Sequence, residues 1–110
     1  FFNAPLDYDQ KTLRKKWKSS TSANMELLKA KLSSLTTFNA ESIEKGFKDF
    51  LTENDLGMGA ALPNFRLLVT GKGMGPSMFQ IAALLGKKEV LSRFENGLLK
   101  ISAIKEETSI

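Results

Sequence analysis

Apolar residues recur at steps of three and four along the whole chain, and no stretch alternates polar with apolar residues over the length of a strand. Because this spacing places the apolar residues on one face of an α-helix, it predicts an all-α fold. A chain of 110 residues, 42% of them hydrophobic, is long enough for one compact core and too short for two. We therefore expect one domain, built as a compact bundle of about six helices.

The expected helices of the first half cover about 9–18, 22–37 and 40–54. Asp7 or Asp9 can cap the first of these, and Asn39 is a favourable N-cap for the third. In the second half the expected helices cover about 60–70, 76–85 and 87–101, and the short loops between them imply antiparallel neighbours. The apolar stripes are expected to pack in the chain's own core rather than against a partner helix or a membrane.

The two ends are expected to lie outside the bundle. The chain begins with Phe rather than Met, and residues 1–5 are typical of a linker entering a domain, so we expect a piece of a longer protein. The expected boundaries are a linker over 1–8, the helical domain over 9–104 and a frayed tail over 105–110.

A glycine-rich turn over 71–75, closed by Pro76, separates the fourth expected helix from the fifth. Proline is tolerated at the opening of a helix, and glycine allows positive φ or a close approach to a ligand. Arg66 and Thr70 lie four residues apart and share a helix face that leads to this turn. Unpaired backbone amides beside Arg66 and Lys72 would suit an anionic, hydrogen-bonding partner such as RNA.

The chain has no histidine and no cysteine, which removes the usual zinc sites, thiol nucleophiles and imidazole bases. The close carboxylate pairs are expected on polar helix faces or in the tail: Glu41/Glu44, Asp49/Glu53 and Glu106/Glu107. We therefore expect no catalytic residue and no metal site. The glycine turn is not a nucleotide loop either, because Gly73 stands where a Walker loop needs Ser or Thr, and Pro76 where a dinucleotide fingerprint needs glycine. No run of roughly 18 apolar residues exists to span a bilayer, so we expect a soluble protein.

Charge is distributed unevenly along the chain. Residues 1–20 carry five basic against two acidic side chains, residues 21–60 four against six, and residues 61–110 seven against four. A polyanion would be attracted to the basic ends if the fold brings them to one surface, although solvated helix faces are the simpler interpretation of such clusters.

Several segments together resemble the C-terminal anticodon-binding domain of bacterial-type glutamyl-tRNA synthetases. They are LGMG at 56–59, PNFRLLVTGKGMGP at 63–76, MFQIAALLGKKEVLSRF at 78–94, and the opening 1–17 with its F-x-x-P-x-x-Y-D and K-x-W elements. The sequence departs from the family pattern at Phe65 and Val69, where leucine is usual. Both changes replace one apolar residue by another, so they affect packing detail only.

The resemblance implies an all-helical cage of class I aminoacyl-tRNA synthetases that receives the anticodon loop of tRNA. In the family, an arginine reads one anticodon base and a G-P turn contacts another, and the matching positions here are Arg66, Gly75, Pro76 and Met78. The candidate RNA-binding residues are Arg66, Thr70, Lys72, Gly75, Pro76 and Met78. Charge alone adds possible phosphate contacts, which are Lys11, Lys15 and Lys87.

For the parent protein, the resemblance implies a glutamate–tRNA ligase whose separate catalytic domain uses ATP and Mg. The present chain is then neither catalytic nor bound to a cofactor. We expect a cytoplasmic, monomeric parent enzyme with tRNA as its partner. Two alternatives stay open: a helical protein–protein module that docks another chain through the apolar turn at Met74, Pro76 and Met78, and a purely structural domain without RNA binding.

Overall fold

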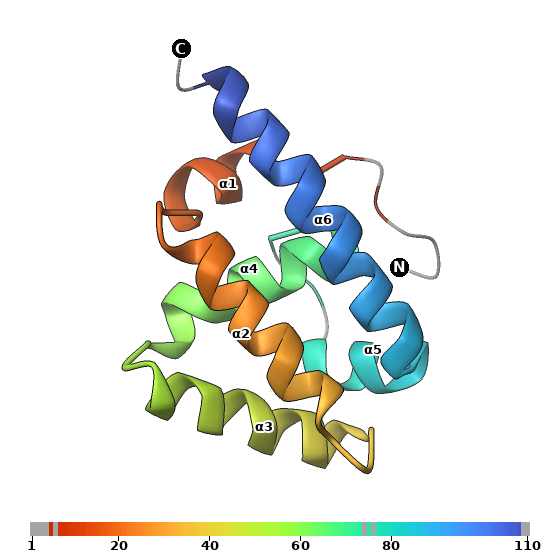
Figure 1. Ribbon diagram of the computed structural model, residues 1–110. Coiled ribbons are helices and arrows are strands. Elements are labelled where there is room, and N and C mark those ends of the chain that lie inside the picture. Colours follow the sequence, from red (N-terminus) through yellow and green to blue (C-terminus); the bar gives the residue numbers. More distant parts are fainter. Residues whose placement is uncertain (1–4, 6, 74, 76, 109–110) are drawn as a thin grey trace.

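The computed structural model describes residues 5, 7–73, 75 and 77–108, with side chains as far as residue 104. This part of the chain forms six α-helices, whose arrangement is drawn in Figure 1: α1 (Gln10–Lys16), α2 (Thr21–Ser33), α3 (Ala40–Glu53), α4 (Met58–Thr70), α5 (Met78–Leu85) and α6 (Lys87–Thr108). No strand occurs among these residues. The prediction of an all-α bundle of about six helices is confirmed.

Side-chain caps fix the start of two helices. The Asp9 carboxylate accepts a hydrogen bond from the Thr12 amide at 3.0 Å, so Asp9 rather than Asp7 is the N-cap of α1. The Asn39 side chain accepts one from the Ser42 amide at 2.8 Å, as expected for α3. Helix α1 ends at Lys16, because Trp17 takes an extended conformation and is buried in the core.

The other helix ends differ from the expected ones by a few residues. Helix α2 ends at Ser33 rather than near 37, and α4 begins at Met58, two residues early. Helix α5 begins at Met78 rather than at Pro76, which lies outside the described residues. Helix α6 continues to Thr108, so the segment expected to fray from 105 onward begins as helix. The expected linker over 1–8 also needs a correction, because Tyr8 is a buried core residue.

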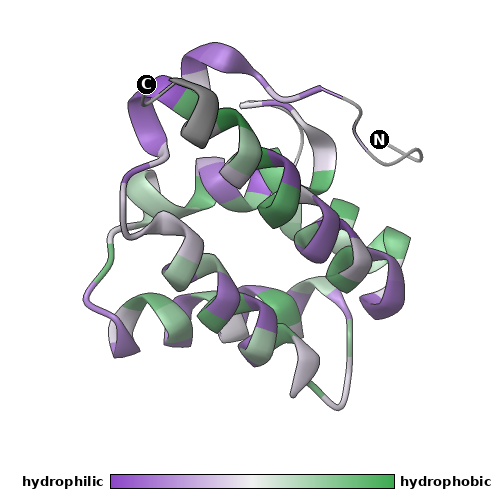
Figure 2. Cartoon of the chain, turned by 45° about the horizontal axis from the view of Figure 1, so that its top comes forward, coloured by the Kyte–Doolittle hydropathy of each residue, from purple (hydrophilic) through white to green (hydrophobic). Residues whose placement is uncertain are grey.

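Helix α4 lies in the middle of the molecule (Figure 1) and packs against α1, α6, α2 and α3. Residues 64–69 of this helix are all buried, as in a helix that has neighbours on every side. The outer helices mix hydrophilic and hydrophobic residues along their length (Figure 2), and their apolar residues belong to one shared core.

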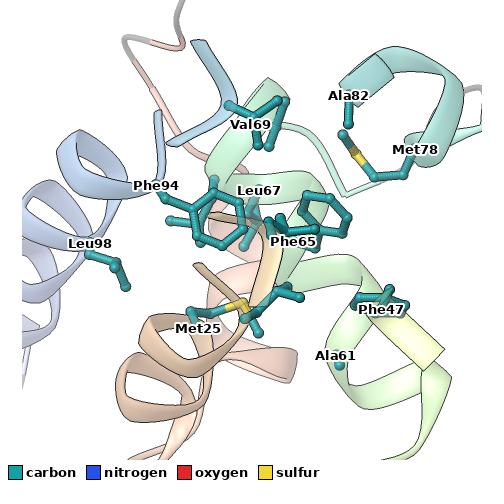
Figure 3. Packing of buried hydrophobic residues seen from close by; sticks show 14 of the residues in the cluster. Met25, Phe47, Ala61, Phe65, Leu67, Val69, Met78, Ala82, Phe94 and Leu98 are labelled. Carbon is teal, nitrogen blue, oxygen red and sulfur yellow. The ribbon is translucent and has the colours of Figure 1, made fainter. Parts of the chain in front are cut away.

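Aromatic rings join the helices at the centre of this core. The ring centroid of Phe65 on α4 lies 5.5 Å from that of Phe47 on α3 and 5.6 Å from that of Phe94 on α6. Figure 3 shows these rings together with Met25, Leu67 and Leu98. Such pairs contribute beyond their buried area, about 0.5–1.5 kcal/mol each. The core therefore fixes α4 between α3 and α6, and with it the segment that leads into the glycine turn.

Among the described residues, none of the helices is both long and apolar enough to cross a membrane.

Candidate nucleic-acid interface

The end of α4 is held by hydrogen bonds within the chain. Gly71 ends the helix at φ 77°, and its amide donates to the Leu67 carbonyl at 2.8 Å. The Thr70 hydroxyl donates to the Arg66 carbonyl at 2.9 Å and accepts from the Lys72 amide at 3.2 Å. The expectation of unpaired amides throughout this turn is thus wrong for residues 71 and 72, whose amides have partners at the end of the helix.

Helix α1 is attached to α4 near both of its ends. At its start, the Asp9 amide donates to the Gly71 carbonyl at 2.9 Å. At its end, the Asn64 side-chain amide donates to the carbonyls of Lys16 and Ala60, each at 3.0 Å. These bonds fix the position of α1 beside α4 and the turn.

A hollow of about 470 Å³ lies between α1 and the turn, and we call it the lysine hollow. Its lining residues are Asp9, Lys11, Thr12, Lys15, Lys16, Pro63, Lys72 and Gly73. Four of these residues are lysines and one is an aspartate, and this excess of positive charge makes the hollow attractive to an anion. The fold brings Lys72 from the second half of the chain beside the basic residues of the first.

Asp9, the acidic member of the lysine hollow, is engaged as the cap of α1. Hydrogen bonds from the Thr12 hydroxyl and from the Thr12 amide, followed by the nearby charges of Lys11 and Lys72, hold the pKa of the Asp9 carboxyl below its usual range. The carboxylate is therefore ionised at neutral pH and neutralises only part of the positive charge around it.

A second hollow, of about 310 Å³, adjoins the first, and we call it the arginine hollow. It is lined by Met58, Gly59, Leu62, Pro63, Arg66, Gly73 and Gly75. Pro63 and Gly73 line both hollows, so the two are neighbours on one face of the molecule.

Arg66 is 9% exposed, so only a small part of its side chain reaches the surface at the arginine hollow. Burial lowers the pKa of its guanidinium, which nevertheless stays charged at neutral pH. The turn passes close to this group: a Cβ atom added to Gly75 would lie 3.2 Å from Arg66 Nη1. Glycine at 75 therefore lets the backbone approach the guanidinium.

Five of the nine predicted site residues line the two hollows. Arg66 and Gly75 line the arginine hollow, while Lys11, Lys15 and Lys72 line the lysine hollow. Thr70 lies half-buried at the end of α4, where it holds the turn, and Pro76 lies outside the described residues.

Two predicted site residues lie elsewhere. Met78 is 1% exposed and belongs to the core (Figure 3), so its side chain cannot cover a base from this position. Lys87 Nζ donates to the carbonyls of Ser33, at 3.2 Å, and Leu35, at the end of α2. A cation there complements the helix dipole, which makes Lys87 a capping residue rather than part of either hollow.

Sequence reasoning missed Met58, Leu62 and Lys16 as lining residues. Met58 and Leu62 precede Arg66 by eight and four residues and therefore share its helix face. The expected helix over about 60–70 already places Leu62 on the face of Arg66, whereas Met58 joins that face only because α4 begins at Met58.

Residues 1–98 match the family model described as "Anticodon binding domain". The chain therefore belongs to this family of anticodon-binding domains.

The relatives of the chain include glutamate–tRNA ligases. One from Flavobacterium psychrophilum is 41% identical and one from Bacteroides fragilis 38% identical, each over 98 residues that make up 89% of this chain. The crystal structure of a glutamate tRNA ligase from Elizabethkingia meningosepticum superposes with a TM-score of 0.85 at 30% identity, over 90% of this chain and 20% of the other. The chain spans 19% of the length of these two curated relatives. These relatives do not support the alternative interpretation as a protein–protein or purely structural module.

Proposed function

We propose that this chain binds the anticodon loop of a tRNA as part of a glutamate–tRNA ligase, an enzyme that attaches glutamate to its tRNA at the expense of ATP. The observation that carries the proposal is the side-by-side position of the two hollows, one with a guanidinium and one with four lysines. Membership of the anticodon-binding family and the identity to glutamate–tRNA ligases support the same function.

The two hollows suit the two parts of an unpaired nucleotide. A guanidinium can bind the hydrogen-bonding edge of a base that is turned out of a loop. Lys11, Lys15 and Lys72 can bind the flanking phosphates, whose contacts strengthen binding without reading sequence. Binding should therefore weaken as salt increases, while the preference for one anticodon depends on Arg66. The backbone at Gly75 and the neighbouring Pro76 complete the base-contacting part of this proposal, and Met78 supports it only from the core.

The ATP and magnesium sites of the parent enzyme belong, in this proposal, to its catalytic region. We also propose that the parent enzyme is cytoplasmic and monomeric, as the resemblance to bacterial-type synthetases suggests.

Fluorescence anisotropy with two labelled RNA hairpins tests the proposal. One hairpin carries the glutamate anticodon, and the other carries an unrelated anticodon on the same stem. Arg66→Lys keeps the charge but loses the planar fork of donors. We expect it to weaken binding of the glutamate hairpin about tenfold, equivalent to about 1.4 kcal/mol, with little effect on the other hairpin.

Arg14→Lys is the matched control, because Arg14 is an exposed arginine of α1 that lines neither hollow. It should leave both affinities unchanged. If Arg66→Lys weakened the affinity for both hairpins equally, Arg66 would not be reading a base. If the unaltered chain bound neither hairpin, the proposal would be wrong.

A further inference from the structure

One wall of the arginine hollow is a side of α4 on which Met58, Leu62 and Arg66 follow one another at intervals of four residues. Residues at this spacing lie one above the other on the same helix face. Exposure falls along the row, since Met58 is 38% exposed, Leu62 is half-buried and Arg66 is 9% exposed. The hollow thus combines an apolar wall at its exposed end with a guanidinium at its buried end.

This combination fits a nucleobase better than it fits a phosphate. A base has apolar faces that can lie on Met58 and Leu62, and a polar edge that can reach Arg66. A phosphate would lose hydration against the same wall. None of the described lining residues of this hollow is a lysine, whereas the neighbouring hollow across Pro63 and Gly73 contains four.

Exposure alone does not mark Met58 as a binding residue, because Leu27, Leu84 and Leu99 are more exposed than Met58. Single exposed apolar residues are common on protein surfaces and need no ligand. Met58 differs from these three because it lines a hollow beside a charged group, and they line neither hollow. The three leucines therefore provide control positions for an experiment.

We propose that Met58 and Leu62 form a stacking wall for one base of the bound RNA, whose edge is bound by Arg66 and whose adjoining phosphates enter the lysine hollow. The inference rests on the proposed function, since RNA must occupy the face that carries the two hollows. The unbranched, polarisable methionine side chain adapts to a flat ring. Stacking tolerates every base, so Met58 supplies affinity while Arg66 supplies the preference.

NMR of the methionine methyl groups tests this contact without changing the wall. The chain has four methionines, and ¹³C labelling of their methyl groups gives one signal for each. Met58→Leu identifies the Met58 signal by its loss. On addition of the glutamate-anticodon hairpin, we expect this signal to move upfield in the ring current of the stacked base. The signals of Met25 and Met78, which are each 1% exposed, should move much less. Inorganic tripolyphosphate, which has charge but no base, should not shift the Met58 signal.

Affinity measurements supply the second arm. Met58→Ala should weaken binding of the glutamate hairpin and of the unrelated hairpin by a similar factor, about three- to tenfold, because stacking does not depend on the base. Leu84→Ala, at a 64% exposed position on α5, should change neither affinity. The inference would be overturned if RNA bound saturably to the chain without moving the Met58 signal, and if Met58→Ala bound RNA with full affinity. That result would leave the proposed function intact. Absence of RNA binding by the unaltered chain would overturn both.

Discussion

Two glycines of the turn, Gly71 and Gly73, lie so close to other atoms that a side chain would not fit. Gly71 has a φ of 77°, and a Cβ atom at this position would lie 2.5 Å from the Asp7 carbonyl oxygen. Gly73 lies over Thr12, where an added Cβ atom would meet the Thr12 hydroxyl. The first position needs glycine for its backbone conformation and for space, and the second needs it for space alone.

Gly71→Ala should lower the free energy of unfolding by about 2 kcal/mol, because it combines a left-handed backbone with a collision against a backbone carbonyl. Urea unfolding followed by circular dichroism measures this change. Gly59→Ala is the control, because Gly59 lies within α4 and an added Cβ atom there would meet no other atom within 4 Å. This substitution should leave the free energy of unfolding unchanged or raise it by up to about 1 kcal/mol. Equal stability of Gly71→Ala and the unaltered chain would contradict this account of the turn.

Residue identity predicted several of the residues that line the two hollows, and it suggested others that lie elsewhere. Arg66, Gly75, Lys11, Lys15 and Lys72 could be singled out because charge and glycine spacing are visible in the sequence. Helical spacing places Met78 on one buried stripe with Ile81 and Ala82, but whether the Met78 side chain stays exposed depends on where α5 begins. The partners of Lys87 could not be predicted, because the end of α2 is distant in the sequence.

At the scale of elements, hydrophobic periodicity and N-caps predicted the number and type of the helices. Helix ends were less predictable, since tertiary contacts decide them. Trp17 leaves the helical conformation, and Gly57 serves as the N-cap of α4 despite having no side chain. Pro63 lies inside α4, where proline removes one helical hydrogen bond, yet the helix continues past it to Thr70.

The contact between α4 and α6 depends on a glycine. A Cβ atom at Gly97 of α6 would lie 2.6 Å from Leu68 Cδ2 and 3.5 Å from Leu68 Cα. Gly97→Ala should therefore destabilise the fold by about 1–3 kcal/mol through overpacking, although alanine favours helix. Thermal and urea unfolding would show the change.

Gly46→Ala is a matched substitution within another helix. Gly46 is a buried residue of α3, but an added Cβ atom there would meet Leu35 at an ordinary 3.4 Å. Alanine should stabilise the fold at this position by about 0.5–1 kcal/mol. If both substitutions changed stability in the same direction, close packing of α4 on α6 would not be the reason for Gly97.

At the scale of the whole molecule, folding gathers charges that are spread along the sequence. The lysines of α1 line the same hollow as Lys72 of the turn. Arg93, in contrast, is buried and donates a hydrogen bond from Nη1 to the Val69 carbonyl at 2.8 Å. The basic second half of the chain thus contributes partly to the lysine hollow and partly to the internal support of α4. Net charge alone could not separate these two uses, because only the fold determines which cations face solvent.

The central claim is that α1, the exposed side of α4 and the glycine turn form one RNA-binding face. Titration of the ¹⁵N-labelled chain with the glutamate-anticodon hairpin, followed by amide NMR, tests this claim most directly. We predict that the largest shifts fall within residues 9–16, 58–66 and 71–77, and that the outer faces of α2 and α3 stay nearly unchanged. Shifts concentrated on α2 and α3, or no shifts at a saturating RNA concentration, would contradict the claim.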